Sequence, residues 1–307
     1  MDMKSAVCLD IGGTYVKYSI ITEDGKIFNN QKERTCKTGR EGLVRQVMNI
    51  ISRLVELSKD YEIKGIGISS GGQVDNKTGK IIYATDNLPG WTGVELGKMV
   101  SEHFKMACFV ENDVNAAALG ELYYGNGKGY DDFVCLTIGT GIGGALVQNG
   151  KLVRGAAGSA GEIGHMIIKA HGRKCNCGNR GCYEQYASVT ALKRDVKEKL
   201  GKNFLPYDVG VEWLFERYGE NDKVKEVVDR YIDYISTGIV SLLHVLNPSL
   251  VIIGGAVSAS DILIKGIEKS VKLMAMPSFL KRLKIMPAYL DNKASLYGVA
   301  SYVFEKV

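Results

Sequence analysis

The sequence predicts an α/β protein made of two similar α/β domains that face each other. Three observations lead to this prediction. Short apolar runs that fit buried strands end at glycine turns. One unit of strand, glycine turn and strand occurs in each half of the chain. The length of 307 residues also suits about two domains of ~150 residues each.

The first unit begins with a predicted strand at 7–10, followed by Gly12, Gly13 and Thr14. A second strand at 16–22 ends at Asp24-Gly25, a common hairpin turn. The spacing of apolar residues, together with helix-capping and helix-ending residues, predicts helices at 41–57, 113–122 and 224–246. Short apolar runs predict strands at 66–69, 133–138 and 250–253.

The repeat is visible in the residues themselves. Residues 7–12 read VCLDIG and residues 134–139 read VCLTIG, so five of six positions are identical. Each copy continues through glycines to a second strand and a tight turn, at Asp24-Gly25 and at Asn149-Gly150. We therefore expect a duplicated unit rather than a chance similarity.

Composition excludes several classes of protein. The net charge of +5 is spread evenly, which does not indicate a nucleic-acid or membrane partner. The 37 glycines have no period and accompany only 5 prolines, so a collagen-like chain is excluded. The N-terminus has no secretory signal, and the apolar stretch 239–257 is too polar to span a membrane. A cytoplasmic protein is expected.

Glycine turns directly after buried strands let backbone N–H groups approach a phosphate closely. Three such turns occur, at 12–14, 139–144 and 254–255. Asp10, at the end of its strand, could hold Mg²⁺ directly or through water. Lys17 either faces the same site or is a solvated strand residue. Together these features favour a site for nucleotide phosphates.

An acidic group follows the apolar residues 107–110. Asp113 lies where a strand would end and a helix begin, so it could accept a proton from a substrate hydroxyl, as phosphoryl transfer requires. Alternatively, Asn112 or Asp113 serves only as the helix N-cap.

Three of the seven cysteines lie within eight residues, at Cys175, Cys177 and Cys182. With His165 they form the spacing His-x9-Cys-x-Cys-x4-Cys, which predicts a closed tetrahedral Zn²⁺ site of structural type. His171 is the alternative fourth ligand. A nucleic-acid zinc finger is disfavoured because nearby basic residues are few and no basic helix accompanies them.

These motifs resemble those of the ROK family (repressor, open reading frame, kinase) of sugar kinases and regulators. The most specific are LDIGGT at 9–14, END at 111–113, EIGH at 162–165 and CNCGNRGCYE at 175–184. The resemblance covers essentially the whole chain and implies the actin-like, hexokinase-like ATPase fold, with two α/β domains around a cleft. The expected domains are 1–112, rejoined by a C-terminal helix at 294–307, and 113–293, with the zinc loop at 165–182.

The resemblance also implies roles for individual residues. Asp113 would be the general base, and His165 would bind zinc through one ring nitrogen and the sugar through the other. The implied sugar-binding residues are Gly72, Asn87, Asn112, Glu162, His165 and Glu184. The implied ATP-binding residues are Asp10, Gly12, Gly13, Thr14, Lys17, Thr140, Gly141, Gly254 and Gly255. The implied zinc ligands are His165, Cys175, Cys177 and Cys182.

The expected function is ATP- and Mg²⁺-dependent phosphorylation of a hexose, at the 6-hydroxyl of glucose or a related sugar, by a homodimer. Gly71-Gly72-Gln73 departs from the common Gly-Pro pattern and is similar to the corresponding residues of N-acetylmannosamine kinases. N-acetylmannosamine and β-glucosides therefore remain alternative substrates. A non-catalytic sugar-sensing regulator is the other alternative. Against it, the first glycine turn begins near residue 10, which leaves no room for an N-terminal helix-turn-helix.

Overall fold

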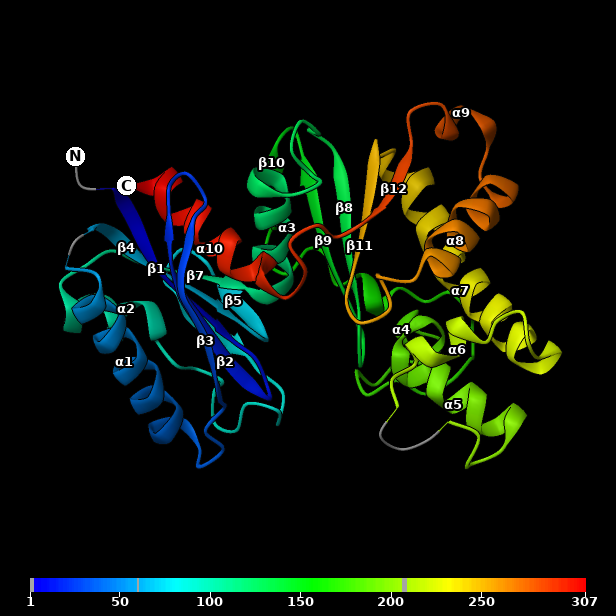
Figure 1. Ribbon diagram of the computed structural model, residues 1–307, viewed down its shortest axis with the longest axis horizontal. Helices are drawn as coiled ribbons and strands as arrows, with labels where there is room; N and C mark the ends of the chain where they lie inside the picture. Colours follow the sequence, from blue (N-terminus) through cyan, green and yellow to red (C-terminus); the bar gives the residue numbers. More distant parts are fainter. Residues whose placement is uncertain (1–2, 60, 206–208) are drawn as a thin grey trace. The chain divides into compact units, whose positions relative to one another are not determined.

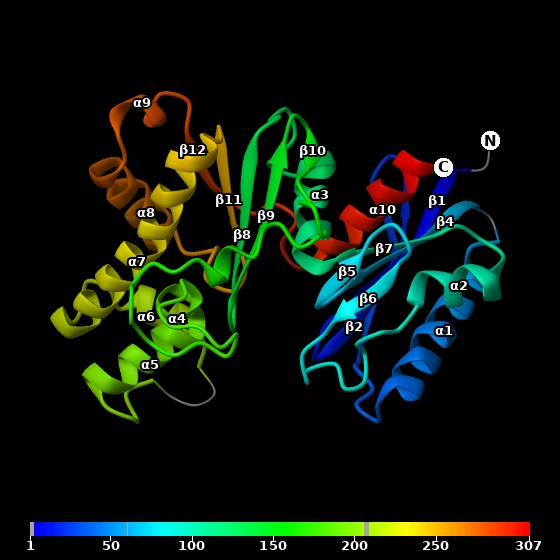
Figure 2. The same ribbon diagram turned by 180° about the vertical axis from the view of Figure 1, so that it is seen from behind.

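The computed structural model describes residues 3–59, 61–205 and 209–307 (Figures 1 and 2). The chain forms two compact units. Unit 1 contains residues 1–129, 154–160 and 292–307, and unit 2 contains residues 130–153 and 161–291. Within the described residues, no helix is both long enough and apolar enough to cross a bilayer.

Unit 1 is built on a five-stranded sheet with the order β3-β2-β1-β4-β7. Strands β1 and β2 are antiparallel, whereas β1, β4 and β7 run parallel. Its strands are β1 (Lys4–Ile11), β2 (Tyr15–Thr22), β3 (Ile27–Arg34), β4 (Glu62–Ser70) and β7 (Cys108–Asn112), with a separate hairpin of β5 (Gln73–Asp75) and β6 (Lys80–Tyr83). Its helices are α1 (Arg40–Leu57), α2 (Leu96–Phe104), α3 (Asp113–Tyr124) and α10 (Ala294–Lys306).

Strand β1 shows how the sequence covers both faces of this sheet. Val7, Leu9 and Ile11 belong to the cluster that includes the apolar residues of α1 and α2. Ala6 and Cys8 belong to a second cluster with α3 and α10. Because successive side chains of a strand point to opposite faces, one uninterrupted apolar run supplies both clusters.

Unit 2 repeats the plan. Its sheet has the order β10-β9-β8-β11-β12, with β8 and β9 antiparallel and β8, β11 and β12 parallel. Its strands are β8 (Phe133–Ile138), β9 (Ile142–Gln148), β10 (Lys151–Leu152), β11 (Leu250–Gly254) and β12 (Lys284–Pro287). Its helices are η1 (Ile163–His165), α4 (Glu184–Ala187), α5 (Val189–Leu200), α6 (Glu212–Glu216), α7 (Asp222–Leu246), α8 (Asp261–Met274) and α9 (Pro277–Leu280). A further short helix, η2 (Asp291–Lys293), begins at Asp291, the last residue of unit 2.

The two sheets therefore share strand order and strand direction, with β1 corresponding to β8 and β2 to β9. The repeat inferred from residues 7–12 and 134–139 is confirmed at the level of topology. The predicted helices and strands are present, with ends that differ by a few residues.

The boundary expected between 112 and 113 falls inside unit 1 and needs correction. Helix α3, which starts at Asp113, packs closely along α10, and residues 154–160 also belong to unit 1. Gly120 of α3 and Gly298 of α10 allow this close approach. A Cβ atom at Gly298 would lie 1.7 Å from the carbonyl oxygen of Ala116. Sequence periodicity does not report which neighbour a helix packs against, so the boundary was misplaced.

Candidate functional site

In unit 1, Asp10 stands at the end of β1, where the chain enters the glycine turn 12–14. Its Oδ1 accepts a hydrogen bond from Ser69 Oγ at 2.8 Å, and its Oδ2 lies 3.3 Å from Lys17 Nζ. Ser69 is the register partner of Asp10 on β4, so the parallel pairing of β1 and β4 places this hydroxyl. Lys17 also donates to the carbonyl of Asn292 at 3.2 Å, which makes it a held residue rather than a freely solvated one.

Asn112 caps α3 with its side-chain oxygen, which accepts hydrogen bonds from the backbone N–H groups of Val114 and Asn115 at 2.9 and 3.1 Å. The capping interpretation is thus correct for Asn112. Its amide nitrogen donates to the carbonyl of Gly72 at 2.8 Å and to Asp113 Oδ1 at 3.0 Å. Asn112 therefore ties the β4–β5 turn to the carboxylate of Asp113.

Asp113 keeps one carboxylate oxygen available. Oδ1 accepts from Asn112 and from the N–H of Val114, whereas Oδ2 accepts no hydrogen bond from the described residues. Loss of hydration raises the pKa of Asp113 to about 6, with the negative charge of Asp10 as the next cause. Such a carboxylate can accept a proton near neutral pH.

One contact beside the start of α3 was not predicted from the sequence. Glu111 is buried, and its Oε1 accepts from the N–H of Asn112 at 3.0 Å and from Asn115 Nδ2 at 3.1 Å. Its Oε2 accepts from Arg154, which is 43 residues away along the chain. No local pattern connects two residues at that separation.

Asn87 lies on an exposed segment that packs against the first glycine turn. A Cβ atom at Gly13 would lie only 3.1 Å from Asn87 Cβ. The segment is anchored by Trp91, which is fully buried and donates from Nε1 to Ser70 Oγ at 3.0 Å. Unit 1 therefore brings Gly72, Asn112 and Asp113 together, and separately brings Gly13 and Asn87 together.

In unit 2, the second glycine turn joins β8 and β9. Thr190 Oγ1 donates to the carbonyl of Thr140 at 2.7 Å, and the N–H of Val189 donates to the carbonyl of Gly139 at 2.9 Å, so the start of α5 holds this turn. A Cβ atom at Gly141 would lie 2.6 Å from Glu184 Oε2, so a side chain there would displace that carboxylate. This turn and Glu184 are thus direct neighbours.

Gly254 and Gly255 follow β11. Gly255 has a φ of +97°, and a Cβ atom there would lie 2.1 Å from the carbonyl oxygen of Ile138, at the end of β8. Both the conformation and the space require glycine. The third glycine turn therefore packs against the strand that leads into the second one.

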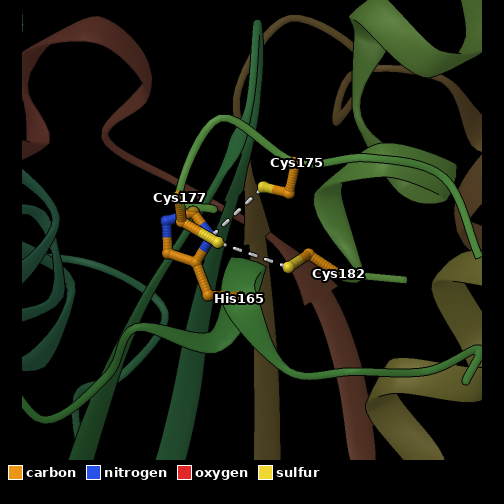
Figure 3. A group of neighbouring side chains, drawn as sticks. All are labelled: His165, Cys175, Cys177 and Cys182. Carbon is orange, nitrogen blue, oxygen red and sulfur yellow. Dashed lines mark hydrogen bonds between the residues drawn. The ribbon is translucent and has the colours of Figure 1, made fainter. Parts of the chain in front are cut away.

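Figure 3 shows the predicted metal ligands gathered into one cluster. The donor atoms of His165, Cys175, Cys177 and Cys182 all lie within 4.8 Å of one another. His165 Nδ1 is 3.7 Å from Cys175 Sγ, and the sulfurs of Cys177 and Cys182 are 3.6 Å apart. His171 is exposed and lies outside this cluster.

The other ring nitrogen of His165 faces a carboxylate. Its Nε2 lies 4.0 Å from Glu162 Oε2. On the cluster side, Glu184 Oε1 lies 3.3 Å from Cys175 Sγ. The structure thus brings Glu162, His165 and Glu184 to the edge of the cysteine cluster. It also orients the imidazole so that its two nitrogens face different partners.

The loop that carries the cysteines is held by its own backbone. Gly181 has a φ of +82°, and its carbonyl accepts hydrogen bonds from the N–H groups of Ile168 and Lys169 at 3.0 and 3.3 Å. Arg173 forms an ion pair with Asp195 at 2.6 Å and lies over the ring of Tyr186. Arg173 therefore stabilises the loop through contacts within unit 2.

The thiols of the cluster differ in acidity. Burial raises the pKa of Cys182 to about 12 and also raises the pKa of Cys175. A hydrogen bond from the backbone of Asn179 lowers the pKa of Cys177. Three thiols and one imidazole at these separations match the donor set of a closed four-coordinate zinc site, in which the metal keeps the thiols deprotonated.

The chain is similar to a known protein family over almost its whole length. The profile of the ROK family matches residues 6–306. The chain is 33% identical over 311 residues to a glucokinase of Thermotoga maritima, and the alignment covers 97% of both chains. It is 28% identical to a xylose repressor of Bacillus spizizenii, with 98% of this chain and 77% of the repressor covered.

A solved structure of a similar protein has the same fold. The ROK family glucokinase of Streptomyces griseus, in complex with glucose and AMPPNP, superposes with a TM-score of 0.83 at 29% identity and covers 98% of this chain and 99% of its own. The predicted α/β class and the hexokinase-like ATPase fold are confirmed. Similar chains include both sugar kinases and repressors.

Proposed function

The chain belongs to the ROK family, and on that premise we propose that it is a kinase that transfers the γ-phosphoryl group of ATP to a hexose. The arrangement around Asp113 carries the proposal. Its available Oδ2, its raised pKa and the hydrogen bond from Asn112 suit a general base rather than a structural cap. A regulator that only senses sugar has no need of such a base.

In this reaction Oδ2 of Asp113 accepts the proton of a primary sugar hydroxyl, which we propose to be the 6-hydroxyl. As the hydroxyl oxygen bonds to the γ-phosphorus, the bond from that phosphorus to the bridging oxygen of ATP breaks and ADP leaves. Gly13 and Thr14 of unit 1 offer backbone N–H groups and a hydroxyl to the phosphates. Gly12, whose N–H already donates to the carbonyl of Tyr15 at 3.0 Å, lets the phosphates come close to the backbone. Unit 2 offers Thr140 and Gly141, with Gly254 and Gly255 for the nucleoside.

Mg²⁺, when bound with ATP, neutralises charge on the phosphates. Asp10 fits a contact through water, because each of its oxygens already has one protein partner and keeps a free lone pair. Lys17, which faces the same carboxylate, adds a positive charge.

We propose that Asn87, Asn112 and Gly72 bind the sugar from unit 1, and that Glu162, His165 and Glu184 bind it from unit 2. Zn²⁺ fits the four donors of the cysteine cluster, and its chemistry there is structural. With Nδ1 of His165 held in this way, Nε2 has a fixed position and tautomer from which to bind a sugar hydroxyl.

A coupled assay for ADP release tests the proposal, with glucose, N-acetylmannosamine, methyl β-glucoside and fructose as acceptors. We expect turnover with a hexose that keeps its 6-hydroxyl, and none with the matching 6-deoxy sugar. Asp113→Asn should retain sugar binding and lose most of kcat, whereas Glu56→Gln, an exposed change on α1, should not affect it. No turnover with any acceptor, or near-normal turnover of Asp113→Asn, would contradict the proposal.

A further inference from the structure

The connection between β3 and α1, residues 35–39, contacts two segments to which the proposed function assigns different ligands. One is the glycine turn 12–14, assigned to the phosphates of ATP. The other is residues 87–92, named here the sugar segment because it includes Asn87. All three lie in unit 1. The inference that follows rests on the proposed function.

This connection holds every residue of the glycine turn by its carbonyl oxygen. The buried Thr35 donates from Oγ1 to Gly12 at 2.6 Å and from its N–H to Thr14 at 3.0 Å. Lys37 donates from Nζ to the carbonyl between them, that of Gly13. The orientation of the peptide groups in the turn therefore depends on this connection.

The sugar segment is held from the same side. Lys37 Nζ donates to the carbonyl of Asn87 at 2.5 Å. Arg40, at the start of α1, donates to the carbonyls of Gly90 and Thr92 at 3.1 and 2.8 Å. Of these contacts, only those of Lys37 reach both the sugar segment and the glycine turn.

The two segments also touch each other directly. Gly13 and Asn87 are close neighbours, since a Cβ atom on Gly13 would be only 3.1 Å from Asn87 Cβ. A shift of either segment must therefore move the other or break the contacts of Lys37. The ammonium group, which carries three hydrogens, can donate to both carbonyls at once.

We propose that Lys37 is a positioning residue that couples sugar binding to nucleotide binding. When a sugar fixes Asn87, the Lys37 ammonium holds Gly13 in the position that receives the phosphates, and the converse follows because binding linkage is reciprocal. Lys37 is exposed, so its removal leaves the core intact. Its contribution should therefore appear in the coupling between ligands rather than in stability.

The test measures the dissociation constant of the sugar by calorimetry, without nucleotide and with saturating AMPPNP and Mg²⁺. The sugar is the member of the four-acceptor panel with the highest kcat/KM. The ratio of the two constants is the coupling factor, expected to be about tenfold in the wild-type chain, within the range usual for coupled sites. In Lys37→Met the ratio should fall to within about twofold of one.

Two matched variants separate coupling from simple loss of a contact. Arg40→Met removes contacts to the sugar segment only, so it should weaken sugar binding equally with and without nucleotide. Lys98→Met, an exposed change on α2, should change neither constant. Lys37→Arg, which keeps the charge, should restore part of the coupling.

Two outcomes would overturn the inference: an unchanged ratio in Lys37→Met, and a wild-type ratio of one. Because the coupling is reciprocal, an unchanged ratio accompanied by weaker AMPPNP binding, measured by titrating AMPPNP into the same variant, would make Lys37 a direct phosphate contact. Wild-type turnover is recorded in the same preparation. Its absence with every sugar would overturn the proposed function, whereas turnover with an unchanged ratio overturns only the role of Lys37.

Discussion

Arg154 and Glu111 form an ion pair that joins the segment 154–160 to the residue two before Asp113. Arg154 donates from Nε at 3.0 Å and from Nη2 at 2.7 Å, both to Glu111 Oε2. The Glu111 side chain is only 2% exposed, whereas that of Arg154 is 27% exposed. The guanidinium also lies 5.5 Å from the centre of the Tyr302 ring, on α10.

Arg154→Met should therefore lower the free energy of unfolding by about 3 kcal/mol, because it leaves a buried carboxylate without its counter-charge. Urea unfolding checks this value. The double variant Glu111→Gln and Arg154→Met removes both charges and should recover much of the loss. The exposed pair of Arg53 and Glu33, at 2.6 Å, is the control, and Arg53→Met should cost less than about 1 kcal/mol. Equal losses from the two pairs would contradict this account.

Asp113 should titrate near pH 6, since burial and the charge of Asp10 favour its neutral form. Only the carboxylate accepts a proton, so kcat/KM should fall as the pH drops below about 6. Carboxyl NMR of the ligand-free chain measures the pKa directly. In Asp10→Asn the second cause is removed, and the pKa of Asp113 should move down.

The same shift has a consequence for stability. The folded-state pKa of about 6 exceeds the usual value of 3.8, so the stabilisation from protonated Asp113 is complete below pH 3.8 and is lost as the pH rises through 6. Asp113→Asn should therefore be more stable than the wild-type chain at pH 8 and not at pH 3. Thermal unfolding at the two pH values decides this, and the same difference at both would count against it.

Cys177→Ser should release zinc and weaken sugar binding, because His165 then loses the metal that fixes its ring. Metal analysis and calorimetry with the sugar give the two readouts. Cys108→Ser is the control, since Cys108 lies on β7 in unit 1 and outside the cluster. Loss of zinc with unchanged sugar affinity would show that the cluster serves only the loop's stability.

Gly298→Ala should destabilise the chain although alanine is the better helix former by about 1 kcal/mol. The added methyl would lie 1.7 Å from the carbonyl of Ala116, and backbone cannot yield without separating α3 from α10. Gly266→Ala on α8 is the comparison. There the nearest atom is the end of the flexible Ile232 side chain, so the loss should be smaller. Denaturant midpoints of both variants test the difference, and a stabilised Gly298→Ala would contradict it.

The sequence alone determined those features that depend on near neighbours in the chain. Apolar runs followed by glycines predicted β1 and β8 with their turns, and the matching residues 7–12 and 134–139 predicted the repeated topology. The spacing of His165 and the three cysteines predicted a cluster that the fold assembles. In each case the residue types and the spacing that carry the prediction lie within a short stretch of the chain.

The tertiary structure decided what depends on residues far apart. Pairing of β1 with β4 brings Ser69 to Asp10, and packing on α10 places α3, which starts at Asp113, in unit 1. Arg154 reaches Glu111, and Lys37 reaches both Gly13 and Asn87, through contacts that have no period in the sequence. Such contacts follow from how whole elements pack, so no local pattern could have predicted them.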